Sequence, residues 1–326
     1  MTHDTDSAAS PASTRACCSG LPPQDRLTLS TGSLDTAGSC RSADAGRLMV
    51  RAAADRPGLV GAVGDFLGRR GANITTLDQY STAGEFGVFF QRTEFELPGL
   101  VDSIDELASD FEHEVAGPLD LTFRVVEAAR RKRTAIMVSR YDHCLMDLLW
   151  RARRGELDID VSMVISNHPD LEESVAQFGV PFEHIPVPRG GKAAAELSQL
   201  SLLAEKVDLV VLARYMQIIS ADFLEQLRCP VINIHHSFLP AFVGADPYRR
   251  AKERGVKLVG ATAHYVTADL DEGPIIDQDV VRVSHRDDTT ELARRGADVE
   301  RLVLSRAVAL HAADRVARLG NSTIVF

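Results

Sequence analysis

Chemistry on a carbonyl group could be carried out by three residues of this sequence, Asn233, His235 and Asp271. A strand is predicted from Val231, and residues two apart in a strand point to the same side, so Asn233 and His235 should face one way. An amide can hold a developing oxyanion, and an imidazole exchanges protons near neutral pH. Asp271 lies in a Leu-Asp-Glu-Gly-Pro turn that could bring a carboxylate to the imidazole. The alternative is an ordinary strand end, but two such stretches in one chain favour a site.

The stretches NIHHSFLPAF (233–242), GATAHYV (260–266) and DLDEGPII (269–276) closely resemble the formyltetrahydrofolate deformylase family. They are more distantly similar to the glycinamide ribonucleotide formyltransferases. The resemblance implies a hydrolase that converts 10-formyltetrahydrofolate to tetrahydrofolate and formate, and so balances the one-carbon folate pool for purine biosynthesis. It implies that folate is the substrate and that no cofactor is needed. By the same resemblance Asn233, His235 and Asp271 are catalytic, His264 supports them, and the substrate contacts Met216, Gln217, Ile219 and Leu270.

Two other functions stay open from the residues alone. The first is formyl transfer to a small amine, and the second is an amino-acid-sensing protein with an inactive enzyme domain. The first strand-to-helix loop, Ser139–Cys144, has no glycine, whereas the nucleotide-dependent transferases use a glycine-rich loop there to bind phosphate. This favours water as the acceptor, although Arg140 could still bind a phosphate. Asp246 stands where the family carries a basic residue, which reverses the local charge toward the glutamate tail of a folate.

Metal binding is the alternative for the histidine and aspartate residues of this region. The ligand count of a metal site would be met only if Asp271, His235 and His264 converged with a further group. The family uses no metal, so none is expected. His236 points to the other side of the strand and is expected to pack or to bond a neighbouring loop.

Composition narrows the class of protein. The chain has 326 residues, 45% of them hydrophobic, and a formal net charge of −10, which argues against a nucleic-acid partner. Its five cysteines are irregularly spaced, so neither a disulfide framework nor a zinc site is favoured, and a reducing cytoplasm fits. No apolar run is long enough to span a membrane, and no signal peptide is expected at the N-terminus.

The N-terminal part divides into a tail and a small domain. Residues 1–45 are rich in Ser, Thr, Ala, Gly and Pro and are expected to be disordered. Residues 46–128 follow a βαββαβ order, which predicts a ferredoxin-like domain. The segment DRPGLVGAV followed by GANI resembles an ACT domain, which often pairs across subunits and binds a small amino acid. The resemblance implies a homo-oligomer and an effector site at Asp55, Gly58, Asn73 and Ile74. A dimerisation module without a ligand is the alternative.

A basic linker, 129–133, is expected to lead into a second domain, 134–326. Strands and helices alternate there, and Val207–Ala213 is an unbroken apolar run typical of a parallel strand covered on both faces. This order predicts a doubly wound, mostly parallel Rossmann-like sheet, and the resemblance implies that it is of the formyl-transferase type. Strands at 256–266 and 275–283 leave no room for a crossover helix, so an antiparallel extension is expected. Residues 289–319 are predicted to be mostly helix, followed by a short strand.

Overall fold

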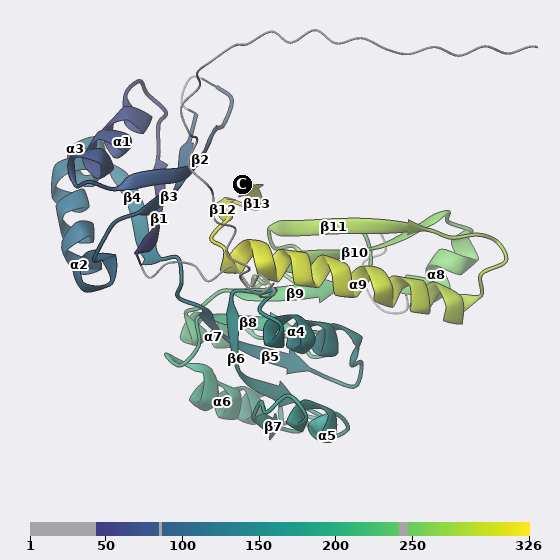
Figure 1. The fold of residues 1–326 in the computed structure, drawn as a ribbon. Helices are drawn as coiled ribbons and strands as arrows, with labels where there is room; N and C mark the ends of the chain where they lie inside the picture. The colour runs from purple at the N-terminus through teal and green to yellow at the C-terminus, as the bar shows by residue number, and fades with distance from the viewer. Residues whose placement is uncertain (1–43, 85–86, 241–246) are drawn as a thin grey trace, which may run out of the picture. The chain divides into compact units, whose positions relative to one another are not determined.

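The computed structural model describes residues 44–84, 87–240 and 247–326 (Figure 1). The predictions for Asp246 and for nearly all of the N-terminal tail lie outside these residues. Within the described ranges, no helix has both the length and the apolar character that crossing a membrane would need.

The first part of the described chain is a four-stranded antiparallel sheet with two long helices packed on it. The strand order is β2-β3-β1-β4, as expected for a ferredoxin-like βαββαβ unit. Phe66 and Phe111, one from each long helix, meet edge to face with ring centroids 5.0 Å apart. The elements are β1 (Ala45–Ala52), α1 (Leu59–Arg69), β2 (Asn73–Ser81), β3 (Phe89–Glu96), α2 (Leu100–Phe111), the π-helix η1 (Glu112–Ala116), α3 (Gly117–Leu119) and β4 (Leu121–Glu127).

A seven-stranded sheet in the order β11-β10-β9-β8-β5-β6-β7 forms the second part. Strands β5 to β9 pair in parallel, while β10 is antiparallel to β9 and to β11, so the predicted doubly wound sheet with an antiparallel extension is confirmed. The elements are β5 (Lys132–Val138), α4 (His143–Arg153), β6 (Ile159–Ser166), α5 (Glu172–Ala176), β7 (Phe182–His184), α6 (Lys192–Leu203), β8 (Leu209–Leu212), α7 (Ala221–Leu227), β9 (Val231–His235), α8 (Pro247–Arg254), β10 (Leu258–Tyr265), β11 (Ile275–Arg282), α9 (Thr289–Ala312), β12 (Val316–Leu319) and β13 (Ser322–Val325).

Both faces of this sheet are covered by helices, which explains the unbroken apolar runs of its strands. Ile136 and Val138 of β5 pack toward α4 and α9, whereas Ala135 and Met137 pack with residues of α6 and α7 on the opposite face. The same alternation in β9 directs Ile232 into the first core. Asn233 and His235 therefore leave β9 on the side of α6, α7 and the loop after β8.

The chain end differs from the prediction of helix to residue 319. Helix α9 ends at Ala312, and a short antiparallel hairpin, β12–β13, follows. Asp314 takes a left-handed backbone conformation with φ +54°, which cannot continue a helix. Apolar residues continue at helical spacing past Ala312. The helix nevertheless ends there, because Asp314 is held in the left-handed conformation and its carboxylate is buried.

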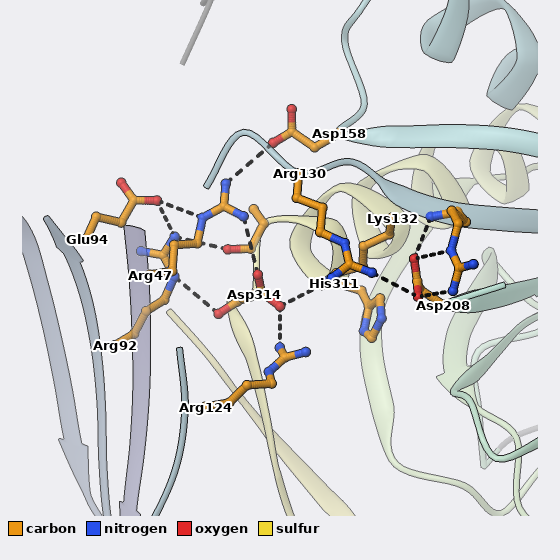
Figure 2. Close-up of polar contacts among 12 residues, drawn as sticks. Arg47, Arg92, Glu94, Arg124, Arg130, Lys132, Asp158, Asp208, His311 and Asp314 are labelled. Atoms are coloured by element: carbon orange, nitrogen blue, oxygen red, sulfur yellow. Dashed lines mark hydrogen bonds and ion pairs between the residues drawn. The ribbon is translucent and has the colours of Figure 1, made fainter. Parts of the chain in front are cut away.

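Asp314 is the centre of a buried ionic network (Figure 2). Its carboxylate accepts from Lys132 at 2.7 Å, from Arg47 at 3.3 Å and from Arg124, and only 2% of its side chain is exposed. Arg92 donates to the backbone carbonyl of Asp314 at 3.1 Å. Burial raises the pKa of this carboxyl, but Lys132 and Arg124 lower it by more, so the net direction is downward. The network joins β1, β3 and β4 to the segment that follows α9.

Candidate active site

The end of β9 presents the two predicted strand residues at the edge of the sheet. Its partner β10 runs antiparallel, and their register sets His264 directly opposite Asn233 and Thr262 opposite His235. Directly opposed residues on neighbouring strands are close enough for their side chains to interact. The Asn233 amide nitrogen lies 3.2 Å from Nε2 of His264. Strand pairing therefore brings a second histidine to a site that begins as Asn-x-His.

The turn after β10 carries Asp271 back toward these residues. Tyr265 donates its backbone N–H to the carbonyl of Pro274 at 2.9 Å, which closes the turn. A Cβ on Gly273 would lie 1.8 Å from the carbonyl oxygen of Tyr265, so only glycine fits there. Asp271 itself has φ +58°, a conformation that Asp tolerates better than most residues. The Asp-Glu-Gly-Pro sequence thus makes a tight return that points a carboxylate at β9.

Two imidazoles flank the Asp271 carboxylate. Oδ2 lies 3.3 Å from Nδ1 of His235, and Oδ1 lies 3.7 Å from Nε2 of His264. The side chains of both histidines are almost fully buried, and that of Asp271 is 12% exposed. His235 first, and then His264, hold the pKa of Asp271 well below its usual value. Asp271 is therefore a carboxylate at any physiological pH.

Hydrogen-bond partners fix the roles of the ring nitrogens. The carbonyl of Tyr265 only accepts, so His264 donates to it from Nδ1 at 2.9 Å, and Nε2 of that ring faces both the Asn233 amide and the Asp271 carboxylate. The Asp271 carboxylate accepts from Nδ1 of His235, which leaves Nε2 of His235 as the atom that can take or give a proton. That Nε2 is buried and has no hydrogen-bond partner among the described residues. The arrangement suits general acid–base chemistry on a bound molecule.

These groups open on a cavity of about 300 Å³ at the carboxyl ends of β8 and β9. Open α/β sheets bind their ligands at this edge. Met216 and Leu270 are about half exposed at 51% and 56%, so they form apolar walls that reach solvent. The eight residues predicted for catalysis, support and substrate contact all line this cavity: Met216, Gln217, Ile219, Asn233, His235, His264, Leu270 and Asp271.

The loop that carries Met216 is tied to the end of β5. Oγ of Ser139 accepts from the backbone N–H of Met216 at 2.9 Å and donates to Asn167 at 2.7 Å. Ser139 is 3% exposed, so these bonds are sheltered from water. The loops after β5, β6 and β8 are thereby fixed to one another beside the cavity.

The four predicted effector residues lie on the ACT-like unit, and none of them lines this cavity. Asp55, Gly58 and Asn73 are exposed, and Ile74 is half-buried. Gly58 precedes α1 with φ +96°, and its carbonyl accepts from Ala62 at 2.8 Å, so it starts the helix. The contacts of these four residues that the structure describes do not test ligand binding, so the effector site stays a prediction.

A second polar cluster beside the cavity was not predicted. Glu300 of α9 is 1% exposed and accepts from Tyr248 at 2.5 Å and from His143 at 2.8 Å, while Nε of Arg214 lies 3.4 Å away. His143 and Tyr248 both come from other helices. The sequence contains a signal for Glu300, because a charge occupies a core position of α9. The buried stripe of that helix runs through Gly296, Glu300, Val303 and Ala307.

One group of described residues brings three potential metal ligands together. Ligand atoms of His143, Cys144 and Glu300 lie within 4.8 Å of one another. Burial raises the pKa of the Cys144 thiol well above its ordinary value, which opposes the thiolate that a metal needs. The carboxylate of Glu300 is already engaged by Tyr248 and His143. This group is better explained as a packed hydrogen-bonded cluster.

Comparison with known proteins matches both parts of the chain. Residues 132–308 match the formyl transferase family model, and residues 46–109 match the ACT domain model. Formyltetrahydrofolate deformylase of Mycobacterium bovis is 62% identical over 284 residues, which are 87% of this chain and 91% of the relative. A crystal structure of a formyltetrahydrofolate deformylase from Pseudomonas syringae pv. tomato superposes with a TM-score of 0.82 at 44% identity. That match covers 86% of this chain and 94% of the other.

A more distant match covers the second part alone. Glycinamide ribonucleotide transformylase 1 from Symbiobacterium toebii has a TM-score of 0.57 at 33% identity, over 60% of this chain and 95% of the other. The deformylase matches extend over both the ACT-like unit and the sheet that carries the cavity.

Proposed function

The chain belongs to the formyltetrahydrofolate deformylase family, and from this we propose that it hydrolyses 10-formyltetrahydrofolate to tetrahydrofolate and formate. The observation that carries the proposal is the carboxylate of Asp271 between the imidazoles of His235 and His264, in a cavity open to solvent. Such a group can move a proton during attack on a carbonyl carbon. In a cell this reaction supplies formate and balances the one-carbon folate pool for purine biosynthesis.

In the proposed reaction a water molecule attacks the formyl carbon. Asp271 helps to position the water, and the amide of Asn233 with protonated His235 stabilises the oxyanion that forms. His235 passes its proton to N10 as the carbon–nitrogen bond breaks, and it is reprotonated by the proton that the attacking water loses. The products are tetrahydrofolate, with hydrogen on N10, and formic acid, which ionises to formate and a proton.

The folate is proposed to lie between the loop after β8 and the Asp271 turn. Met216, Ile218 and Leu270 are exposed by half or more at this place, and all three line the cavity. Apolar walls with a few polar groups at the base are typical of sites for flat aromatic ligands. Gln217 and Ile219 complete the predicted contacts.

Water is favoured over an amine acceptor by the loop that follows β5. Among the described residues, those lining the cavity come from β8 and the loop after it, β9 and its end, β10, and the Asp271 turn, and none comes from residues 139–143. Tyr141 stacks on Arg214, with 4.9 Å from the guanidinium carbon to the ring centroid, and His143 bonds Glu300. These side chains occupy the place where a transferase of this fold would present a phosphate-binding loop.

The decisive experiment is incubation of the full chain with 10-formyltetrahydrofolate and no acceptor. Stoichiometric release of formate and tetrahydrofolate is expected, and both are measured in the same sample. Turnover that begins only when an amine is added would contradict hydrolysis and support the transferase alternative.

The remaining proposals concern the surroundings of the enzyme. The ACT-like unit supports a small amino-acid effector at Asp55, Gly58, Asn73 and Ile74, and pairing of such units supports a homo-oligomer. No separate cofactor is proposed, since the cavity already holds an acid–base group. A cytoplasmic location fits a folate substrate. Sedimentation with and without a panel of amino acids tests both the assembly and the effector.

A further inference from the structure

Arg214 is a buried cation beside the proposed catalytic residues. It lies two residues beyond the end of β8, is 8% exposed and lines the same cavity as His235. Its backbone has φ +63°, a strained conformation for a residue with a side chain, and its carbonyl accepts from Ser139 at 3.3 Å. This conformation places the charged side chain of Arg214 at the wall of the cavity.

The surroundings of Arg214 hold it without using all of its donors. Nε lies 3.4 Å from Glu300, and the guanidinium stacks on Tyr141. Nε and Nη1 are nevertheless buried without a hydrogen bond among the described residues. Buried donors in proteins are almost always paired, so unpaired ones in a cavity wall indicate a missing partner.

The charges of the cavity make Arg214 distinctive. Among the described residues that line it, Arg214 is the one lysine or arginine, whereas Asp269 and Asp271 are acidic. His236 adds no charge at neutral pH, because burial and then the charge of Arg214 lower its pKa to about 4. For a small anion in this cavity, Arg214 is the one lysine or arginine among these residues that attracts it, and the carboxylate of Asp271 repels it.

We propose that Arg214 forms a binding site for a small monocarboxylate, formate, next to Nε2 of His235. This inference rests on the proposed function, in which hydrolysis generates formate inside the cavity. Breaking the bond from the formyl carbon to N10 leaves formic acid, which ionises, and a carboxylate there needs donors for two oxygens. Arg214 offers the planar fork that carboxylates favour, and protonated His235 adds a donor from Nε2. The site holds the product until it leaves.

The expected affinity is modest. Formate has three non-hydrogen atoms, so the best attainable dissociation constant is on the order of 1 mM. A product site of this strength would delay formate release little and would become visible as inhibition at high formate concentration.

The test is saturation-transfer NMR on the formate proton with the full chain, in a formate titration. We expect saturable binding that weakens about tenfold or more in Arg214→Met, since a charge-assisted donor pair is lost. Arg214→Lys keeps the charge without the fork and should weaken binding less. Both variants keep a side chain at the same positive φ, so they are matched for backbone strain. Arg140→Met, an exposed arginine of the neighbouring loop, should bind as the parent does.

The outcomes separate this inference from the proposed function. Equal formate binding by the parent and Arg214→Met would overturn the site. Absence of saturable binding up to about 50 mM formate, far above a dissociation constant of about 1 mM, would overturn it as well. If hydrolysis is normal and formate affinity is the same with and without Arg214, this inference alone is refuted. Arg214-dependent binding without hydrolysis refutes only the proposed function.

Discussion

At the scale of single residues, one carboxylate organises the candidate site. Asp271 contacts His235 and His264 and so orients both rings, and the carbonyl of Tyr265 fixes the tautomer of His264. An imidazole with one nitrogen held by an anion can exchange a proton at the other. The acid–base function of His235 therefore depends on the charge of Asp271.

The first prediction replaces that charge with an amide. Asp271→Asn should lower kcat by roughly 10²–10⁴, because His235 loses the partner that fixes its tautomer and stabilises its cation. Asparagine tolerates the left-handed backbone at this position, so the fold should be kept. Steady-state formate release measures the loss, and circular dichroism checks the fold.

A matched control lies next to it in the sequence. Glu272→Gln removes an exposed carboxylate of the same turn and should leave turnover near the parent value. If Asp271→Asn retains a normal rate, the assignment of Asp271 as a catalytic residue is wrong.

At the scale of elements, the position of Asp271 depends on the turn between β10 and β11. Gly273 packs against the carbonyl of Tyr265 too closely for any side chain, and Tyr265 bonds Pro274 across the turn. The turn is thus built on β10, the strand that also supplies His264. Strand pairing and turn closure set the distance between the carboxylate and both histidines.

The second prediction tests this dependence. Gly273→Ala should cost about 1–3 kcal/mol of stability, since its Cβ would force the turn away from β10. Displacement of the Asp271 carboxylate should also lower kcat. Urea unfolding and formate release measure the two effects.

The comparison is Gly64→Ala in the middle of α1, where a Cβ would meet nothing within 4 Å. It should stabilise the protein by about 0.5–1 kcal/mol, the usual gain of alanine over glycine in a helix. Gly273→Ala with the stability and rate of the parent would mean that the turn can move freely.

Much of the element order could be predicted from the sequence. The alternation of apolar strands with amphipathic helices predicted the parallel sheet. The short spacing between residues 266 and 275 predicted its antiparallel extension. The helix boundary at Ala312 could not be predicted, because it depends on a long-range contact of Asp314 with Arg47. The two-residue spacing of Asn233 and His235 predicted their common side.

The cluster around Arg214 could not be predicted, for two reasons. The positive φ of Arg214 is set by tertiary packing and leaves no trace in the local sequence. Tyr248 and Glu300 are 52 positions apart and meet only because α8 and α9 pack together. The one signal in the sequence is Glu300 in the apolar stripe of α9. It indicates that a buried partner exists but does not identify the partner.

At the scale of the whole molecule, His311 connects the ionic network of Asp314 to the strand that carries His264. Its Nδ1 lies 2.8 Å from the hydroxyl of Tyr265, within hydrogen-bond distance. Burial first, and then the charge of Lys132, lower the pKa of His311 to about 3. Between about pH 3 and pH 6.5 this histidine is therefore neutral in the folded protein, whereas it is protonated in the unfolded chain.

The third prediction follows from this difference. Below about pH 6.5 this histidine is protonated in the unfolded chain, whereas in the folded protein it becomes protonated only near pH 3. The free energy of unfolding therefore decreases as the pH falls through this window. The contribution is on the order of 2 kcal/mol between pH 7 and pH 5. His311→Gln should flatten the decline by that amount, measured by urea unfolding at both pH values.

His113→Gln provides the comparison, since His113 is exposed. It should leave the pH dependence of stability as it is in the parent. A decline in His311→Gln as steep as in the parent would show that other groups account for the acid sensitivity.

Helix α9 carries both Glu300, which holds Arg214 beside the cavity, and His311, which backs Tyr265. At 1.5 Å per residue these two positions are about 16 Å apart along the axis. A helix of 24 residues in regular hydrogen bonding behaves as a stiff rod. A shift of this helix would therefore reach Arg214 through Glu300 and the strand of His264 through Tyr265.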